Sequence, residues 1–421
     1  MDRIAFTTLL MGLIVGTQPV RVEVSPDLHP AAIVYYLDGQ TAGGATAPPW
    51  EANVDFGREL RPHEFTAAAM DASGNRIAAA TRLVNLPAPA SRVDVLIDRA
   101  NGLASAARLV ATSLRGQKPV RETLTLDGKP LALDAESRAR LPKLDLAQTH
   151  VLSASAVFGE DTVARADVAL GGGLADESGS RLTAVAIRLE GGASPTVESL
   201  TGRLRHGAEP LRVVAVDRGP ATVVLVRDPN SGNAQHIVGR STAGTGVRLD
   251  PDDRVGMVWP VAREARIGEQ QARLMESTPY FTGRDGSLFW VLTRVSRSAV
   301  SRPPYLFADA VAAAGLQAFN TGNRRAVILA DWLSFDASQF GPAQVAGYLH
   351  ALGVPLHVWS FSASDSAWGK VEPVRSFVDY RQATEELRRD LDSQRIVWVI
   401  GEWQPGQIEL TPAADGISLL R

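Results

Sequence analysis

The chain has 421 residues, of which 45% are hydrophobic and 21% are charged, and its formal net charge is −3. A length of this order predicts roughly two to four folded domains, each with a hydrophobic core. The charge balance, without a long run of Lys or Arg, excludes a dedicated nucleic-acid-binding surface, which needs clustered positive charge. Since the sequence contains no cysteine, it also excludes disulfides, thiolate metal sites and thiol catalysis.

The N-terminus carries an apolar segment, Ile4 to Val15, after Met1-Asp2-Arg3. This segment has the length of the apolar region of a signal peptide and is too short to span a bilayer. Asp2 weakens the positive charge expected before such a region, so a first β-strand is the alternative. Residues 1–19 are therefore interpreted as either a signal segment or a first strand. No other stretch reaches membrane-spanning length, and no integral membrane domain is expected.

The first half of the chain predicts two tandem β modules. Short apolar strands are separated by Gly, Asp, Asn and Pro, a pattern typical of β-sandwiches. The turn sequence Leu-Asp-Gly occurs at residues 37–39 and again at 126–128, and His63 is matched by His150, at offsets of about 88 residues. We therefore expect Ig-like sandwiches over residues 20–88 and 89–170, and a structural role in the turn for both histidines.

The second half of the chain changes its pattern. Residues 171–219 contain a Gly-rich polar stretch and short strands, and are interpreted as a linker. From about residue 220, apolar β-branched strands alternate with helical segments, such as a helix from Pro342 to Leu352 that is followed by Gly353. Such alternation predicts a mostly parallel sheet with right-handed crossovers over residues 220–421. The expected fold class is thus a multi-domain β plus α/β protein.

Two of the predicted parallel strands run directly into an aspartate. Asp228 follows the strand that begins near Thr222, and Asp331 follows the strand that begins near Arg325. Ligands of open α/β sheets bind beyond the carboxyl ends of the strands. The two aspartates therefore mark the candidate site.

The order of these parts resembles a bacterial VWFA-related family, in which Ig-like modules precede a divergent von Willebrand factor A-like domain. The resemblance covers most of the chain and implies two Ig-like β-sandwiches followed by a Rossmann-like A-type domain. It rests on short motifs in the expected order, at residues 47–50 and 54–57 in the β half and at 252–258, 306–310, 325–331 and 353–359 in the α/β half.

The family's usual site is a metal-dependent adhesion site. It holds Mg²⁺ through an Asp-x-Ser-x-Ser loop, a distant Thr and a later Asp. In this chain Asp228 and Asp331 match the two aspartates, Asn230 stands at the first Ser position, and Tyr305 stands where the Thr belongs. Because Mg²⁺ demands near-octahedral oxygen coordination, the resemblance implies a degenerate site, and we expect no cofactor, with Mg²⁺ as the one metal the pattern admits.

We expect a non-catalytic protein–protein interaction or scaffold protein with an unidentified protein partner. Its expected location is periplasmic or secreted, and a cytoplasmic one stays open. Tyr305 and Trp332 stand beside the two aspartates, so they are the expected aromatic anchors for a partner, with inward core packing as the alternative. Two other hypotheses stay open. One is a hydrolase-type enzyme that uses Asp228 and Asp331 as a carboxylate pair, and the other is a purely structural spacer.

Overall fold

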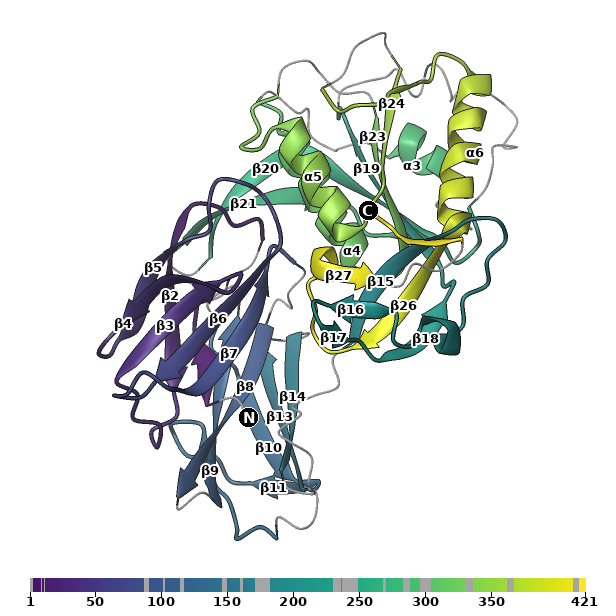
Figure 1. Cartoon of the computed structure of the whole chain (residues 1–421). Coiled ribbons are helices and arrows are strands. Elements are labelled where there is room, and N and C mark those ends of the chain that lie inside the picture. Colours follow the sequence, from purple (N-terminus) through teal and green to yellow (C-terminus); the bar gives the residue numbers. More distant parts are fainter. Residues whose placement is uncertain are drawn as a thin grey trace. The chain divides into compact units, whose positions relative to one another are not determined.

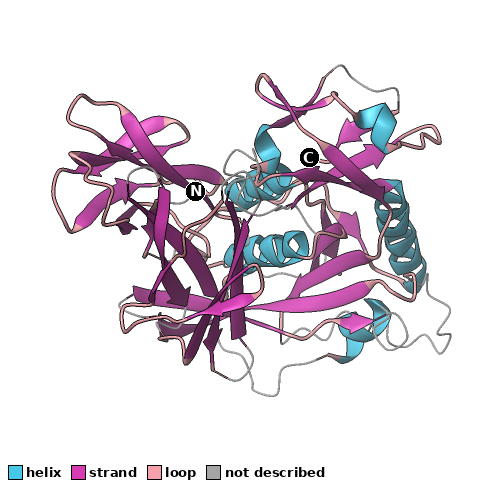
Figure 2. Cartoon of the chain, turned by 90° about the horizontal axis from the view of Figure 1, so that it is seen from below, coloured by secondary structure: helices cyan, strands magenta, loops and turns pink. Residues whose placement is uncertain are grey.

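The computed structural model describes most of the chain, namely residues 3–8, 10, 12–86, 91–100, 103–113, 117–145, 150–159, 162–170, 182–229, 236, 249–267, 270–282, 288–295, 304–330, 336–361, 367–411 and 416–421. The chain divides into two compact units. One contains residues 1–59, 63–181 and 266–270, and the other contains residues 60–62, 182–265 and 271–421. The first unit is built from strands, whereas the second combines strands with helices (Figures 1 and 2).

The first unit begins with a β-sandwich of two antiparallel sheets, one with the strand order β1-β2-β5 and one with the order β4-β3-β6-β7. Alternate side chains from both sheets form the core, among them Val20 and Val54 of the three-stranded sheet and Tyr35 and Phe65 of the four-stranded sheet. The strands are β1 (Ile4–Phe6), β2 (Thr17–Val24), β3 (Ala32–Leu37), β4 (Gln40–Ala45), β5 (Trp50–Asp55), β6 (His63–Met70) and β7 (Arg76–Val84). The first residues of the N-terminal apolar segment, Ile4–Phe6, form β1, which is buried and pairs with β2.

The second sandwich repeats this architecture. Its sheets have the orders β12-β9-β8 and β11-β10-β13-β14. The strands are β8 (Ser91–Ala100), β9 (Leu103–Ser113), β10 (Arg121–Leu126), β11 (Lys129–Leu131), β12 (Arg138–Arg140), β13 (His150–Phe158) and β14 (Thr162–Leu170). Counted along the chain, strands one to seven of the two sandwiches pair in the same order, which confirms the predicted internal repeat.

The second unit is built around a sheet with the order β21-β20-β19-β23-β24-β25. The strands from β20 to β25 in this order are parallel to one another. Every residue of β19 and β23 is buried, as expected for parallel strands covered on both faces. The strands are β19 (Ala221–Arg227), β20 (Arg254–Ile267), β21 (Gln270–Ser277), β23 (Arg324–Ala330), β24 (Leu356–Ser360) and β25 (Glu372–Pro373), and β22 (Phe281–Thr282) pairs antiparallel with β20.

Helices cover both faces of this sheet (Figure 1). Residues of α3 and α6 share a core with Ala326, Ile328 and Ala330 of β23, whereas α4 packs against β19, β23 and α5. The helices are α3 (Leu288–Arg294), α4 (Phe307–Asn320), α5 (Pro342–Leu352) and α6 (Phe377–Ser393). From β19 the chain continues to β20 on one side of it, and the next parallel strand, β23, lies on its other side. The direction of strand addition therefore reverses between β19 and β23, and this is the topological switch point where ligands of such sheets bind.

A further antiparallel sheet, β18-β26-β15-β28, joins the two ends of the second unit. It contains β15 (Leu182–Leu189), β18 (Val213–Asp217), β26 (Gln394–Ile400) and β28 (Ile417–Leu419), and beside it lie α1 (Val197–Leu200), β16 (Leu204–His206), β17 (Glu209–Pro210), the 3-10 turn η1 (Pro405–Gln407) and β27 (Ile408–Leu410). The short strands expected within residues 171–219 are present as β15 and β18, but they belong to this sheet of the second unit, so the interpretation of residues 182–217 as part of a linker was wrong. The interpretation failed because β15 pairs with strands far away in sequence. Thr183 and Gly401, for example, are hydrogen-bonded across 218 positions.

Candidate functional site

The candidate site lies at the carboxyl ends of β19 and β23. Asp228 follows β19 directly, as predicted, and is only 7% exposed. Its backbone carbonyl accepts a hydrogen bond from Nη1 of Arg227 at 3.2 Å, and the Arg227 guanidinium lies over the ring of Trp259, 5.3 Å from the ring centroid. Asp228 is therefore a buried residue held among packed side chains, rather than a carboxylate that projects into solvent.

The remaining residues of the predicted metal site cannot be placed in the same way. Asn230 and Asp331, together with the predicted anchor Trp332, lie outside the described residues. Within the described ranges, no three His, Asp or Glu side chains come together as a metal site would require. The assignment of Asp228, Asn230 and Asp331 as degenerate metal ligands, and of Trp332 as an anchor, stays a prediction.

Tyr305 does not present the ring surface that a partner anchor needs. Its residue surface is 2% exposed, and its ring packs against Phe307 with the ring centroids 5.9 Å apart. Its backbone carbonyl accepts a hydrogen bond from the amide of Ala337 at 2.9 Å. A large aromatic ring gains more free energy from burial than from exposure, and here it fills space beside the start of α4. The expectation of an exposed Tyr305 was wrong.

Side chains from the segment before α5 cap the start of α4. The two carboxylate oxygens of Asp336 accept hydrogen bonds from the backbone amides of Phe307 at 2.9 Å and Ala308 at 3.0 Å. Oγ of Ser338 accepts from the amide of Asp309 at 3.1 Å and donates to Asp336 at 2.6 Å. These amides are among the unsatisfied donors at a helix N-terminus, where the helix dipole also favours negative charge.

Asp309 of α4 makes the reciprocal contact with the segment before α5. Its carboxylate accepts hydrogen bonds from the backbone amides of Gln339 at 3.0 Å and Phe340 at 3.2 Å, just before α5 begins. We call Asp309, Asp336 and Ser338 the capping clamp, because each segment satisfies backbone donors of the other. The carboxylate oxygens of the clamp are thus arranged to hold α4 and α5 together. An ion-binding arrangement would instead point them toward a shared centre.

The capping clamp was not predicted from the sequence. The available signal was the short polar sequence Asp336-Ala-Ser338 ahead of the Gly341-Pro342 helix start, since Asp and Ser favour capping positions. Such a pattern predicts a cap for the helix that follows it. It does not reveal that Asp336 caps α4, which begins 29 residues earlier at Phe307.

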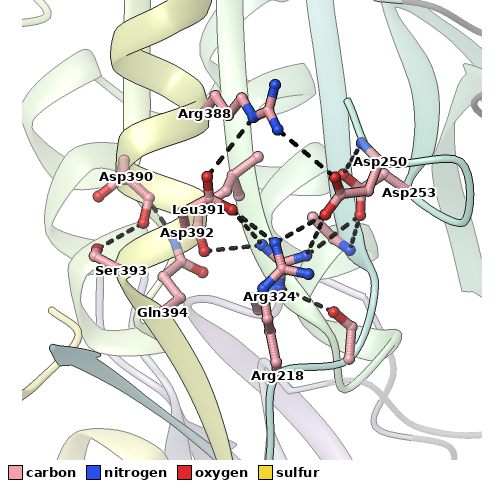
Figure 3. Close-up of polar contacts among 12 residues, drawn as sticks. Arg218, Asp250, Asp253, Arg324, Arg388, Asp390, Leu391, Asp392, Ser393 and Gln394 are labelled. Atoms are coloured by element: carbon pink, nitrogen blue, oxygen red, sulfur yellow. Dashed lines mark hydrogen bonds and ion pairs between the residues drawn. The ribbon is translucent and has the colours of Figure 1, made fainter. Parts of the chain in front are cut away.

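The opposite edge of the sheet holds a buried arginine (Figure 3). Arg324 is the first residue of β23 and is 1% exposed. Its guanidinium donates to the backbone carbonyls of Gly219 and Leu391, each at 3.0 Å, and approaches Oδ1 of Asp253 at 3.4 Å. Asp253 also accepts from the amide of Ala221 at 2.6 Å. Arg324 therefore ties together the starts of β19, β20 and β23 and the C-terminal end of α6.

A partly exposed layer of charges surrounds Arg324. Nη2 of Arg218 lies 2.8 Å from a carboxylate oxygen of both Asp250 and Asp392. The hydrogen bond from Arg218 holds the pKa of Asp250 below its ordinary value, whereas burial raises the pKa of Asp253 and lowers the pKa of Arg324. Because ligands of such sheets bind at the carboxyl edge, this network at the amino edge is assigned to structure rather than to binding.

The first sandwich contains a His–Asp contact at its Asp-Gly turn. Asp38 has a φ of 50° and Gly39 a φ of 79°, so the two residues between β3 and β4 form the kind of turn that requires positive φ. The Asp38 carboxylate accepts from the amide of Glu64 at 2.9 Å and lies 2.8 Å from Nδ1 of His63. The turn is thereby fixed to the start of β6.

The second sandwich repeats this contact. Asp127 has a φ of 48°, accepts from the amide of Val151 at 2.8 Å and lies 2.7 Å from Nδ1 of His150. The repetition confirms the predicted structural role of both histidines in the turns.

Comparison with known proteins identifies no family for the chain. No protein-family model matches it, and no curated protein matches it. Similar solved structures include fibronectin(III)-like modules of CbhA from Clostridium thermocellum, at 14% identity over 42% of this chain and 100% of that chain, with a TM-score of 0.17. The central fibronectin-III array of RIM-binding protein is similar at 10% identity over 47% of this chain and 80% of that chain, with a TM-score of 0.23.

A third structure is SGBP-B of the Bacteroides ovatus mixed-linkage glucan utilization locus, solved with a mixed-linkage heptasaccharide. It is 10% identical over 51% of this chain and 90% of that chain, with a TM-score of 0.14. Scores this low carry no argument, so the assignment of two Ig-like sandwiches rests on the strand pairing of this chain. Among the described residues, no helix is long and apolar enough to cross a membrane.

Proposed function

We propose that the chain is a non-catalytic protein–protein interaction or scaffold protein, in which two Ig-like sandwiches precede a divergent A-type domain without a working metal-dependent adhesion site. The strand order β21-β20-β19-β23-β24-β25, with helices on both faces and the switch point at β19, supports a Rossmann-like A-type domain. As part of this proposal, the protein acts in the periplasm or after secretion.

The capping clamp is the observation that carries this proposal. In a working adhesion site, a metal ion at this edge leaves one coordination position for a partner's carboxylate. In this chain, the amides of Phe307, Ala308 and Asp309 at the start of α4 are satisfied by Asp336 and Ser338. These described polar groups at the start of α4 are engaged within the protein, which favours a partner contact that does not depend on a metal.

Titration calorimetry of the full chain with Mg²⁺ and with Mn²⁺ tests the metal part of the proposal. We expect no binding in the micromolar range, and the same baseline for Asp228→Ala. Micromolar binding that is abolished by Asp228→Ala would overturn this part, because it would show that the site still coordinates an ion.

Affinity capture from native extract, with and without EDTA, tests the interaction part. We expect one specific partner whose capture is unaffected by EDTA, and cross-linking of the complex should place the contact on the second unit.

Trp332→Ala, compared with the wild-type chain, tests the predicted anchor. Capture that EDTA abolishes would favour a metal-dependent site, and cell fractionation tests the proposed location outside the cytoplasm.

A further inference from the structure

Near the side of the parallel sheet that ends with β24 and β25, a histidine lies between two carboxylates. His357 lies on β24, and its Nδ1 is 3.6 Å from Oε1 of Glu372 on β25. Its Nε2 is 3.5 Å from Oδ2 of Asp390 on α6. The side chains of His357, Glu372 and Asp390 are 12%, 17% and 16% exposed, so the ring and both acids are largely withdrawn from water.

The charges around His357 are balanced only when the ring is protonated. Glu372 faces it from β25 and Asp390 from α6, and Arg188 of β15 donates to the far oxygen of Asp390 at 2.6 Å. From β23, the residue opposite His357 is the apolar Ile328. Two carboxylates and one guanidinium leave one negative charge, which a buried site tolerates poorly. An imidazolium at His357 neutralises it.

Each carboxylate belongs to a different element. The strap, defined as residues 367–376, contains β25 and leads into α6. Glu372 of β25 is paired with Trp359 of β24, and the amide of Val374 donates to the carbonyl of Ser360 at 2.7 Å. The contact of His357 with Glu372 therefore holds the strap, and its contact with Asp390 holds the C-terminal half of α6.

We propose that protonated His357 is a proton-dependent lock that fastens the strap and the C-terminal half of α6 to β24, and that mildly alkaline solution weakens this fastening. When the ring loses its proton, it can donate to only one of the two acids. The net negative charge of the two acids is then no longer neutralised, although Asp390 keeps its contact with Arg188. The strap has only a two-residue strand of its own and is otherwise held by the buried side chains of Trp368 and Val374, so the contact of Glu372 with His357 adds to these.

The expected direction of the pH effect follows from the His357 pKa. Burial lowers this pKa, but the nearby carboxylates of Asp390 and Glu372 favour the charged ring, outweigh burial and raise the pKa to about 9. The ordinary value in an unfolded chain is about 6.5. The stabilisation is therefore complete below about pH 6.5 and is lost progressively as the pH rises toward about 9.

The free energy of unfolding of His357→Gln, measured as a function of pH, tests the lock. The matched control is His350→Gln, which changes an exposed histidine on α5. The wild-type and control chains should lose stability between about pH 6.5 and 9, by up to about tenfold in the unfolding constant per pH unit. His357→Gln should be less stable at low pH and should show a flatter profile. Hydrogen exchange should locate the difference in α6 and the strap. A parallel profile for His357→Gln would overturn the proposal.

An NMR titration of the His357 ring, assigned by its absence in His357→Gln, gives a direct measurement. The midpoint should lie near the raised value, and a midpoint at or below about 6.5 would overturn the proposal. If His357→Gln does not fold, Glu372→Gln supplies the same test, because removal of one carboxylate should lower the midpoint. An unchanged midpoint in Glu372→Gln would contradict the lock.

Discussion

At the scale of single residues, the sandwiches depend on an aspartate in the left-handed backbone region. Asp38 and Asp127 each combine a positive φ with a carboxylate that reaches the first residues of a later strand. Asp tolerates this conformation better than most side chains because it can hydrogen-bond locally. The turn was therefore predictable from the Asp-Gly sequence. Its partner amide was not, because it lies in a strand more than twenty residues away.

Replacing Asp38 tests the turn of the first sandwich. Asp38→Gly keeps a residue that suits a φ of 50° but removes both hydrogen-bond acceptors, so the free energy of unfolding should fall by about 1–3 kcal/mol. Asp38→Asn keeps an oxygen for the Glu64 amide and should cost less. Urea denaturation of the full chain measures both, and a fully stable Asp38→Gly would show that the carboxylate does not hold the turn.

Replacing Asp127 tests the electrostatics of the second turn. The hydrogen bond with Asp127 is the main cause that raises the pKa of His150, and the same bond lowers the pKa of Asp127. Asp127→Asn should lower the midpoint of His150 toward its ordinary value of about 6.5, as measured by NMR, with the exposed His350 as the reference. The pair therefore stabilises the fold in the pH range between the lowered pKa of Asp127 and the raised pKa of His150, and this stabilisation is lost as the pH rises through the His150 pKa or falls through the Asp127 pKa. A His150 midpoint that stays in place would contradict this account.

At the scale of elements, the parallel sheet is fastened at both the amino and the carboxyl ends of its strands by charged and polar side chains. Arg324 holds the amino edge, and the capping clamp of Asp309, Asp336 and Ser338 holds helices at the carboxyl edge. The sequence pattern predicted the alternation of strands and helices, because hydrophobic periodicity is a local property. It did not predict these fastenings, since each of them joins residues from separate elements.

Arg324→Met should destabilise the second unit by about 3–5 kcal/mol, because it leaves Asp253 buried without its cation and the carbonyl of Leu391 without its donor. Arg388→Met is the matched control. Arg388 belongs to the same network but its side chain is 47% exposed, and such exposed pairs contribute about 1 kcal/mol or less. Denaturant titration of both variants measures the difference. Similar small losses would show that burial does not set the importance of Arg324.

Asp336→Ala should expose the first amides of α4 and lower the free energy of unfolding by about 1–2 kcal/mol, as the loss of a helix cap does. Ser338→Ala removes one acceptor at the same helix end and should cost less. Denaturation curves provide the measurement, and hydrogen exchange should rise first at the start of α4. An unchanged Asp336→Ala would mean that water replaces the carboxylate without loss.

At the scale of the whole molecule, the chain consists of two compact units with separate cores. Much of this organisation could be predicted, since the internal repeat and the change of pattern near residue 220 both mark it in the sequence. The assignment of residues 182–217 to the second unit could not be predicted, because the strands that pair with β15 lie at the other end of the unit in sequence. The inward direction of the Tyr305 ring could not be predicted either, because it is set by packing against neighbouring residues such as Phe307.

Scanning calorimetry of the full chain should show at least two unfolding transitions, one for each unit. Asp38→Gly should move only the transition of the sandwiches, and Arg324→Met only that of the second unit, because each substitution acts on a core that the other unit does not share. A single transition that shifts with both variants would show that the units unfold together.

The pairing of β15 with β26 has a consequence for the synthesis of the chain. On the ribosome, strands of the sandwiches meet partners made shortly before or after them, so this unit can fold while translation continues. β15 must wait until β26 has emerged. At about 5–20 residues per second, that delay is about 10–40 s. Throughout this time the nascent chain carries the apolar residues Val185 and Ile187 on an unpaired strand. A chain that stalls before residue 394 therefore offers this strand to chaperones or to aggregation.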